Sequence, residues 1–91
     1  MGKIIVRAST VCGALPVEGA AVYINGEIRG YTGANGYSGL FEADGERCTL
    51  KIYADGYEKY LLERVRLYKN ATVIVSAMLE GQTRSKNQEK R

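Results

Sequence analysis

Two cysteines, Cys12 and Cys48, are the most reactive side chains of this 91-residue chain, which contains no histidine. A disulfide between them would add about 2–4 kcal/mol to the stability of a small domain. Two thiols alone are too few to hold a metal ion. Cys48 alternates with apolar residues along Arg47–Ala54, where a free cysteine packs as a small hydrophobic side chain. We therefore expect two free cysteines, with a disulfide as the alternative.

An acidic run is the second group that could do chemistry, because Glu42, Asp44 and Glu46 lie close together. Carboxylates bind Ca²⁺, but a calcium loop needs further oxygen ligands at defined positions, and this run lacks them. We expect a solvated turn instead. Without histidine, no nucleophile and base pair is recognisable elsewhere. The sequence therefore predicts no catalytic residue, no metal site and no cofactor, and hence no enzyme.

Tyrosines are the remaining candidates for recognition, since the chain has seven of them against one Phe and no Trp. A tyrosine ring offers an apolar face and a polar hydroxyl, and exposed rings stack on glycans, peptides or bases. Alternatively, rings such as those of Tyr23 and Tyr53 pair with each other on an outer sheet face. The candidate binding surface consists of Tyr23, Tyr31, Tyr37, Tyr53, Tyr57 and Tyr60.

The net charge of +3 is confined to one end of the chain. Residues 1–80 contain nine basic and nine acidic side chains, whereas residues 81–91 contain four basic and one acidic. A neutral domain lacks the clustered basic patch of a nucleic-acid-binding face. We expect a flexible basic tail over residues 81–91. Weak binding of nucleic acid or of an acidic surface through this tail is our third hypothesis for function.

Long apolar segments would indicate a membrane span or a signal peptide. None approaches the roughly 20 apolar residues of a membrane span, so we expect none. The run Ile4–Val6 is too short for the core of a signal peptide. We therefore expect a cytoplasmic protein, or else a particle component or a domain from a secreted or surface protein.

Short strands are the elements that must position these side chains. Alternating apolar and polar residues, separated by Asn-Gly, Asp-Gly and Gly-rich breaks, predict an antiparallel sheet with tight turns. Asn25-Gly26 has the sequence of a type I′ hairpin turn. We expect seven strands, at Lys3–Ser9, Ala20–Asn25, Glu27–Thr32, Ser38–Glu42, Arg47–Ala54, Glu58–Leu67 and Ala71–Leu79.

One of these segments also has a helical interpretation. Tyr57, Leu61, Arg64 and Tyr68 recur at helix-like spacing. Helix-favouring residues (Glu58, Leu61, Leu62 and Glu63) occur in the same segment. The end of the segment, Val65–Tyr68, alternates like a strand. We therefore expect a strand here, with a helix as the alternative.

In this order, the segments resemble the carboxypeptidase regulatory-like family. The similarity runs from about Gly2 to Leu79. It rests on the motifs Pro16–Val22 (PVEGAAV), Thr32–Gly36 (TGANG), Leu40 and Gly45–Tyr57 (GERCTLKIYADGY). Pieces of the same stretch, VEGA and VYING, are similar to PEGA domains. The resemblance implies one domain over residues 1–80, an all-β, seven-stranded antiparallel β-sandwich of Greek-key type, transthyretin-like (prealbumin-like) and related to Ig-like folds.

The resemblance also implies a function. We expect a non-catalytic structural module that binds a protein or glycan partner. The alternative is a small self-assembling or decorating protein, such as a phage or particle component, that forms homo-oligomers through a sandwich edge.

Two kinds of chemistry occur in related folds. Transthyretin-like enzymes that hydrolyse hydroxyisourate rely on histidines, which this chain lacks. Related pilin domains form a Lys–Asn isopeptide bond, for which Lys3 and Asn70 would be the candidates. Those domains carry an assisting acid where Ile52 stands here, so we do not expect this bond.

Overall fold

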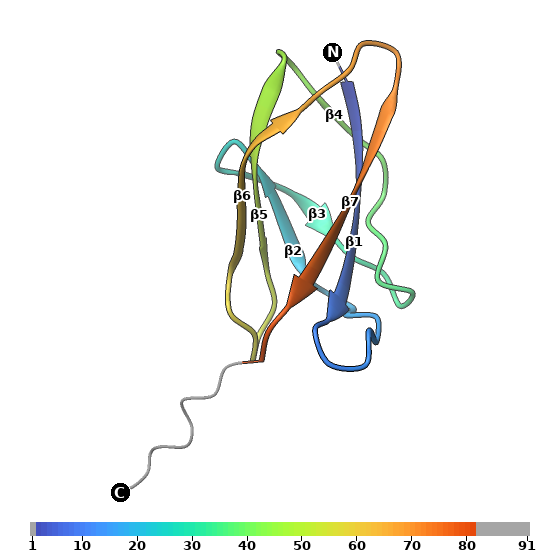
Figure 1. The fold of residues 1–91 in the computed structure, drawn as a ribbon, viewed down its shortest axis with the longest axis vertical. Helices are drawn as coiled ribbons and strands as arrows, with labels where there is room; N and C mark the ends of the chain where they lie inside the picture. Colours follow the sequence, from blue (N-terminus) through green and yellow to red (C-terminus); the bar gives the residue numbers. More distant parts are fainter. Residues whose placement is uncertain (1, 82–91) are drawn as a thin grey trace, which may run out of the picture.

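The computed structural model describes residues 2–81, and these form seven strands and no helix (Figure 1). The strands are β1 (Gly2–Thr10), β2 (Ala21–Ile24), β3 (Glu27–Tyr31), β4 (Phe41–Ala43), β5 (Arg47–Tyr53), β6 (Tyr60–Arg66) and β7 (Thr72–Leu79). No helix that could span a membrane occurs among these residues. The prediction of an all-β chain with seven strands is confirmed, and the segment with the helical alternative is strand β6.

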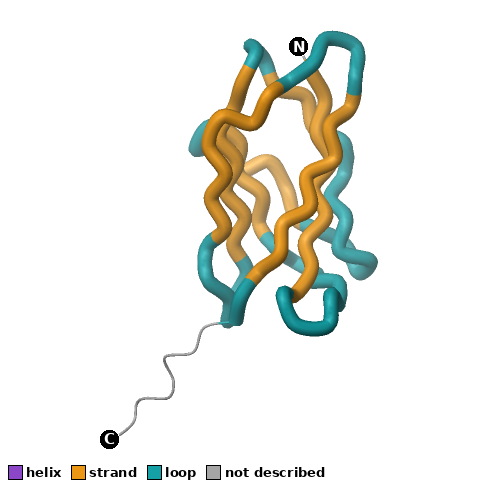
Figure 2. The backbone as a smooth tube through the Cα atoms, in the orientation of Figure 1, coloured by secondary structure: helices purple, strands orange, loops and turns teal. Residues whose placement is uncertain are grey.

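The strands form two sheets that lie against each other as two layers (Figure 2). One sheet has the order β4-β1-β7 and the other the order β3-β2-β5-β6. All pairs are antiparallel except β1 and β7, which run parallel from Lys3 opposite Thr72 to Thr10 opposite Leu79. The prediction of a wholly antiparallel sandwich is therefore wrong for this pair. No tight turn joins these two strands, so no local signal sets their relative direction.

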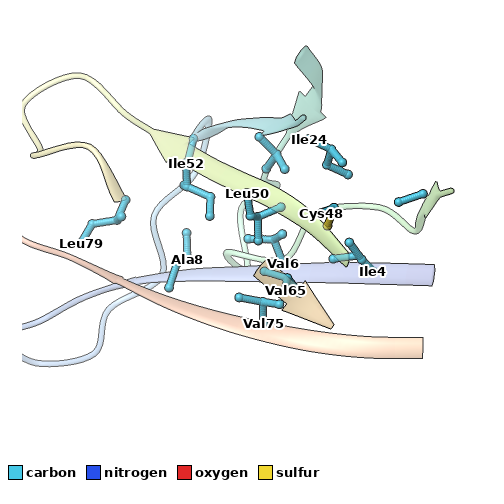
Figure 3. Close-up of a cluster of buried hydrophobic side chains, with 14 of the residues drawn as sticks. Ile4, Val6, Ala8, Ile24, Cys48, Leu50, Ile52, Val65, Val75 and Leu79 are labelled. Carbon is cyan, nitrogen blue, oxygen red and sulfur yellow. The ribbon is translucent and has the colours of Figure 1, made fainter. Parts of the chain in front are cut away.

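The core lies between the two sheets and is built from the inward faces of the strands (Figure 3). Ile4, Val6 and Ala8 of β1 face Leu50 and Ile52 of β5 across the interior, and all five are fully buried. The alternation in the sequence assigned these residues to one face of their strands, and the structure confirms it. Apolar burial of this kind supplies most of the driving force for folding.

Strand β6 contains a bulge that interrupts the period of two in its sequence. Its register against β5 shifts so that Leu62 lies opposite Leu50 while Val65 lies opposite Cys48. Arg64 lies within this bulge and has a φ of +64°. The inward positions are therefore three residues apart at this point instead of two, which mimics the period of a helix.

Strand β4 begins at Phe41, three residues later than the predicted strand Ser38–Glu42. The side chain of Ser38 is the reason. The backbone N–H of Val6 donates to Ser38 Oγ at 2.9 Å, while the Ser38 N–H donates to the Val6 carbonyl at 2.7 Å. A hydroxyl thus replaces the backbone carbonyl as acceptor, and the regular ladder starts only beyond it.

Two turns require glycine or asparagine. Asn25 and Gly26 have φ values of +53° and +84°, which confirms the type I′ turn between β2 and β3. Gly36 has a φ of +85°, as its turn sequence predicts. A Cβ atom at Gly36 would lie 2.6 Å from the carbonyl oxygen of Ala8, so this turn packs directly on strand β1.

Thr32 ties the segment before β2 to the end of β3. Its hydroxyl accepts a hydrogen bond from the Ala20 N–H at 2.9 Å and donates to the Val17 carbonyl at 2.6 Å. Its backbone exchanges further bonds with Gly19 and Ala20. Thr32 is only 4% exposed, so these bonds are shielded from water.

The predicted tail over residues 81–91 lies outside the described residues except for Gly81. Gly81 forms an isolated antiparallel bridge with Tyr57, next to the start of β6. The first residue of that segment therefore still belongs to the folded part.

Candidate functional site

Three tyrosines project from the outer face of the four-stranded sheet, and we call Tyr23, Tyr31 and Tyr53 the tyrosine face. They come from the three adjacent strands β2, β3 and β5. Ala21 of β2 pairs with Tyr31 on one side and with Tyr53 on the other. Since neighbouring strands lie about 4.8 Å apart, the two tyrosine Cα atoms are about 10 Å apart, with a methyl group between them. Ala21 is only 8% exposed and lines a hollow together with these two tyrosines.

Tyr23 belongs to the next row of the sheet. It lies opposite Lys51, whose Nζ is 4.4 Å from the centroid of the Tyr23 ring. A cation over an aromatic ring is attracted to its negative face. Tyr23 and Tyr53 are therefore diagonal neighbours and not the directly opposed pair of the alternative hypothesis. The Tyr23 ring is engaged by Lys51, whereas Tyr31, 61% exposed, is the most open ring of the face.

Two shallow hollows flank Tyr53. The first has a volume of about 360 Å³ and is lined by Tyr23, Lys51, Tyr53, Glu58 and Lys59. The second has a volume of about 410 Å³ and is lined by Val17, Glu18, Gly19, Ala21, Tyr31, Tyr53, Ala54, Asp55 and Tyr57. Both hollows are open to solvent. They therefore suit a ligand that lies along the surface more than one that is enclosed.

The second hollow combines aromatic rings with two carboxylates. Tyr31, Tyr53 and Tyr57 line it together with Glu18 and Asp55. Ionised carboxylates only accept hydrogen bonds, whereas tyrosine hydroxyls both donate and accept. This arrangement matches a ligand with apolar faces and many hydroxyl groups.

The remaining tyrosines lie elsewhere. Tyr60 is half-buried, packs against the core and lines a different hollow, with Val11 and Met78. Tyr37 belongs to the side of the three-stranded sheet, where the Arg7 guanidinium carbon lies 5.8 Å from its ring centroid. Tyr68 follows β6, next to Arg66. The structure thus brings Tyr23, Tyr31, Tyr53 and Tyr57 together but places Tyr37 and Tyr60 apart from them.

Sequence reasoning did not assign Glu18, Asp55 or Ala21 to the site. In the sequence, Asp55 belongs to an Asp-Gly break, and Glu18 belongs to the motif Pro16–Val22. The alternation along β5 did place Lys51 on the same face as Tyr53. The signal that was available for Ala21 is its position, two residues before Tyr23 on the same face of β2.

The two cysteines are free in the structure. Cys12 is exposed in the segment between β1 and β2, and Cys48 is buried in the core (Figure 3). Burial raises the pKa of the Cys48 thiol, which keeps it neutral and poorly nucleophilic. Among residues 2–81, no cluster of three or more His, Cys, Asp or Glu side chains could hold a metal ion.

Lys3 and Asn70 line a third hollow, of about 220 Å³, together with Glu42. Lys3 pairs with Glu42 across β1 and β4. All three side chains are exposed. An amine attacks an amide only in its neutral form, which burial away from water favours. The exposure of this group gives no support to an isopeptide bond.

No protein-family model matches the chain, and no curated protein is detectably similar to it.

Proposed function

We propose that the chain is a non-catalytic, transthyretin-like β-sandwich of the carboxypeptidase regulatory-like type that binds a glycan or protein partner through its tyrosine face. The geometry favours a glycan. The observation that carries this proposal is the hollow beside Ala21, which Tyr31 and Tyr53 line together with Glu18 and Asp55.

The strand order supports the fold part of the proposal. Strand β4 crosses to the sheet opposite β3 and pairs with β1, as in a Greek-key connection, where a later strand returns to lie beside the first. The last strand, β7, also pairs with β1, so the first and last strands both belong to the three-stranded sheet. The four-stranded sheet is left with one uninterrupted outer face.

The shape of the face favours a glycan over a folded protein. A sugar ring has apolar C–H faces that stack on tyrosine rings, and its hydroxyls donate to carboxylates. The two hollows follow one another along the sheet and share Tyr53, so an extended chain of sugars would contact both. A protein interface would instead use a larger apolar centre surrounded by a polar rim.

Binding of soluble oligosaccharides to the full chain tests the proposal. A panel of neutral and acidic oligosaccharides is titrated while tyrosine fluorescence is recorded, since the chain has no Trp to mask that signal. We expect Tyr31→Ala to weaken binding at least about fivefold, because loss of one stacked ring costs about 1 kcal/mol or more.

Tyr68→Ala is the matched control. Tyr68 is 53% exposed, close to the value for Tyr31, but it lies outside the tyrosine face. This variant is expected to bind like the unmodified chain. Equal losses for both variants, or no binding of any oligosaccharide in the panel, would contradict a glycan site here. Binding of peptides with the same dependence on Tyr31 would identify a protein partner instead.

A further inference from the structure

The two sheets have four edge strands, and three of them carry features that block pairing with another strand. Strand β4 has only three residues. Strand β3 contains two charged residues and a glycine, and its register against β2 is shifted. Strand β6 contains Glu63, Arg64 and Arg66 as well as the bulge. Short edges, charges and bulges are the usual ways in which natural proteins prevent edge-to-edge association.

Strand β7 has none of these features. Its eight residues, TVIVSAML, include no charge, no glycine and no proline, and they pair with β1 without a register shift. Ile74 is 60% exposed and Met78 is 46% exposed on its outer face. Strand β7 lies at the border of the three-stranded sheet, with β1 on one side only. It is the unprotected edge among the described strands.

The backbone of β7 shows which groups are free. The carbonyls of Ala71 and Leu79 accept hydrogen bonds from the β1 side, from Lys3 at 3.2 Å and from Val11 at 3.1 Å. Because successive residues of a strand direct their N–H and C=O groups to opposite sides, those of Ile74, Ser76 and Met78 point away from β1. They take part in no backbone bond outside the strand ladders of residues 2–81.

The free stretch ends near Glu80. Its carbonyl accepts a hydrogen bond from the Glu58 N–H at 2.7 Å, on the side away from β1. The opening therefore spans most of β7 and closes where Tyr57 meets Gly81. An added strand would lie along Thr72–Leu79.

We propose that β7 pairs antiparallel with β7 of a second copy of this chain, so that two three-stranded sheets join into one continuous sheet. This surface is separate from the tyrosine face, and the inference does not depend on the ligand proposed there. Pairing about a two-fold axis brings equivalent residues of one strand together. A charged edge such as β6 would oppose like charges in such a pair, whereas β7 carries no charge.

The exposed apolar residues select one register. With Ser76 opposite Ser76 of the second copy, Ile74 lies opposite Met78 of the second copy. The two most exposed apolar side chains of the strand then cover each other. On the inner face, Val75 lies opposite Ala77 of the second copy. Ile74, Ser76 and Met78, whose backbone groups point away from β1, would form three cross-strand pairs with the second copy. These pairs would exchange about six backbone hydrogen bonds.

A second copy also fits the charge of the chain. Residues 2–81 contain nine basic and nine acidic side chains, so the part of the chain that carries β7 has no net charge to oppose pairing. A pairing of this length buries less than the roughly 1,200 Å² of a stable interface, and the dimer is therefore expected to depend on concentration.

A cysteine at the axis tests the register. In a Cys12→Ser background, Ser76→Cys places two thiols at a hydrogen-bonded pair, where Cα atoms are about 5.5 Å apart and a disulfide fits. Thr72→Cys is the matched control on the same strand. In this register, position 72 of one copy would lie about 27 Å from position 72 of the second copy, at about 3.4 Å per residue. We expect rapid disulfide dimers of the Ser76→Cys chain only.

Solution mass tests the edge itself. We expect the mass of the full chain to rise above the monomer value of 10.0 kDa with concentration, as measured by light scattering behind size exclusion. Ile74→Lys should return it to the monomer, since a charge on the edge opposes pairing. Ile28→Lys, at an exposed apolar position on β3, is the control and should leave the mass unchanged.

Three results would overturn the proposal. A chain that stays monomeric at all concentrations would do so, as would a dimer that persists in Ile74→Lys. Hydrogen exchange supplies the third. Slow exchange of the Ile74, Ser76 and Met78 amides in dilute monomer would mean that another segment of the same chain occupies the edge. Protection that appears only with the dimer supports the second copy.

Discussion

Replacing Thr32 with valine removes one buried hydroxyl and leaves the shape of the side chain almost unchanged. The hydroxyl accepts from the Ala20 N–H at 2.9 Å and donates to the Val17 carbonyl at 2.6 Å. In the valine variant, a methyl group stands in place of that oxygen. Both backbone groups then lose their partner at a site that is closed to water, because Ala20 is fully buried and Val17 nearly so.

The cost follows from these two groups. A buried donor or acceptor without a partner costs about 1–3 kcal/mol. Loss of a partner for both the Ala20 N–H and the Val17 carbonyl should lower the free energy of unfolding by about 2–6 kcal/mol. A domain of this size has roughly 4–12 kcal/mol in total, so the variant should lose a large part of its stability.

Urea unfolding followed by circular dichroism measures this difference. With a slope near 1 kcal/mol per molar urea for a small domain, the midpoint should fall by about 2 M or more at an unchanged slope. Thr32→Ser is the matched control, because it keeps the hydroxyl and loses one methyl group. That methyl is worth about 1 kcal/mol.

The reasoning would be refuted in either of two ways. A Thr32→Val chain within about 0.5 kcal/mol of the unmodified protein would mean that the hydroxyl contributes little net stability. A Thr32→Ser chain as unstable as the valine variant would mean that packing of the methyl group matters more than the two hydrogen bonds.

Gly36→Ala should lower the free energy of unfolding by about 2 kcal/mol or more, since its Cβ would meet the Ala8 carbonyl at 2.6 Å. Gly45→Ala, at a similar φ of +87° but with no atom closer than 3.9 Å to the added Cβ, should lower the free energy of unfolding by less. Thermal melts of the two variants compare these losses. A thiol reagent should label Cys12 in the folded protein but label Cys48 only on unfolding; equal rates would contradict the buried position. Burial raises the pKa of Cys48, so the unfolded chain loses this proton first as pH rises. Stability should therefore fall above about pH 8.5, and Cys48→Ala should make that fall less steep.

Much of the fold was predictable because alternation is a local property. The inward faces of β1, β2 and β5 follow from a period of two, and each can be read without knowledge of its partner. The bulge at Arg64 is different, because it breaks this period and resembles a helical spacing. The resemblance implied a sandwich, but which strands share a sheet and the parallel pairing of β1 with β7 were not predictable from alternation, since these pairings join segments distant in sequence.

The tyrosine face was predictable only in part. Tyr53 and Lys51 share a face by alternation within one strand. Tyr31 joins them because the register of β3 on β2 shifts between Val22 and Tyr23, and no sequence signal marks that shift. Tyr60, in turn, faces inward and packs against the core. The grouping of side chains from different strands depends on register, which a single sequence does not specify.

The parallel pair of β1 and β7 sets the order in which the chain can fold as it leaves the ribosome. Strands β2, β3, β5 and β6 have all emerged by Arg66 and can pair among themselves. Strand β1 is made first, yet it must wait for β7 before its second edge is covered. At about 5–20 residues per second, the roughly 60 residues between them take several seconds to synthesise. During that interval the nascent protein presents the unpaired edge of β1, where a chaperone would find its earliest binding site.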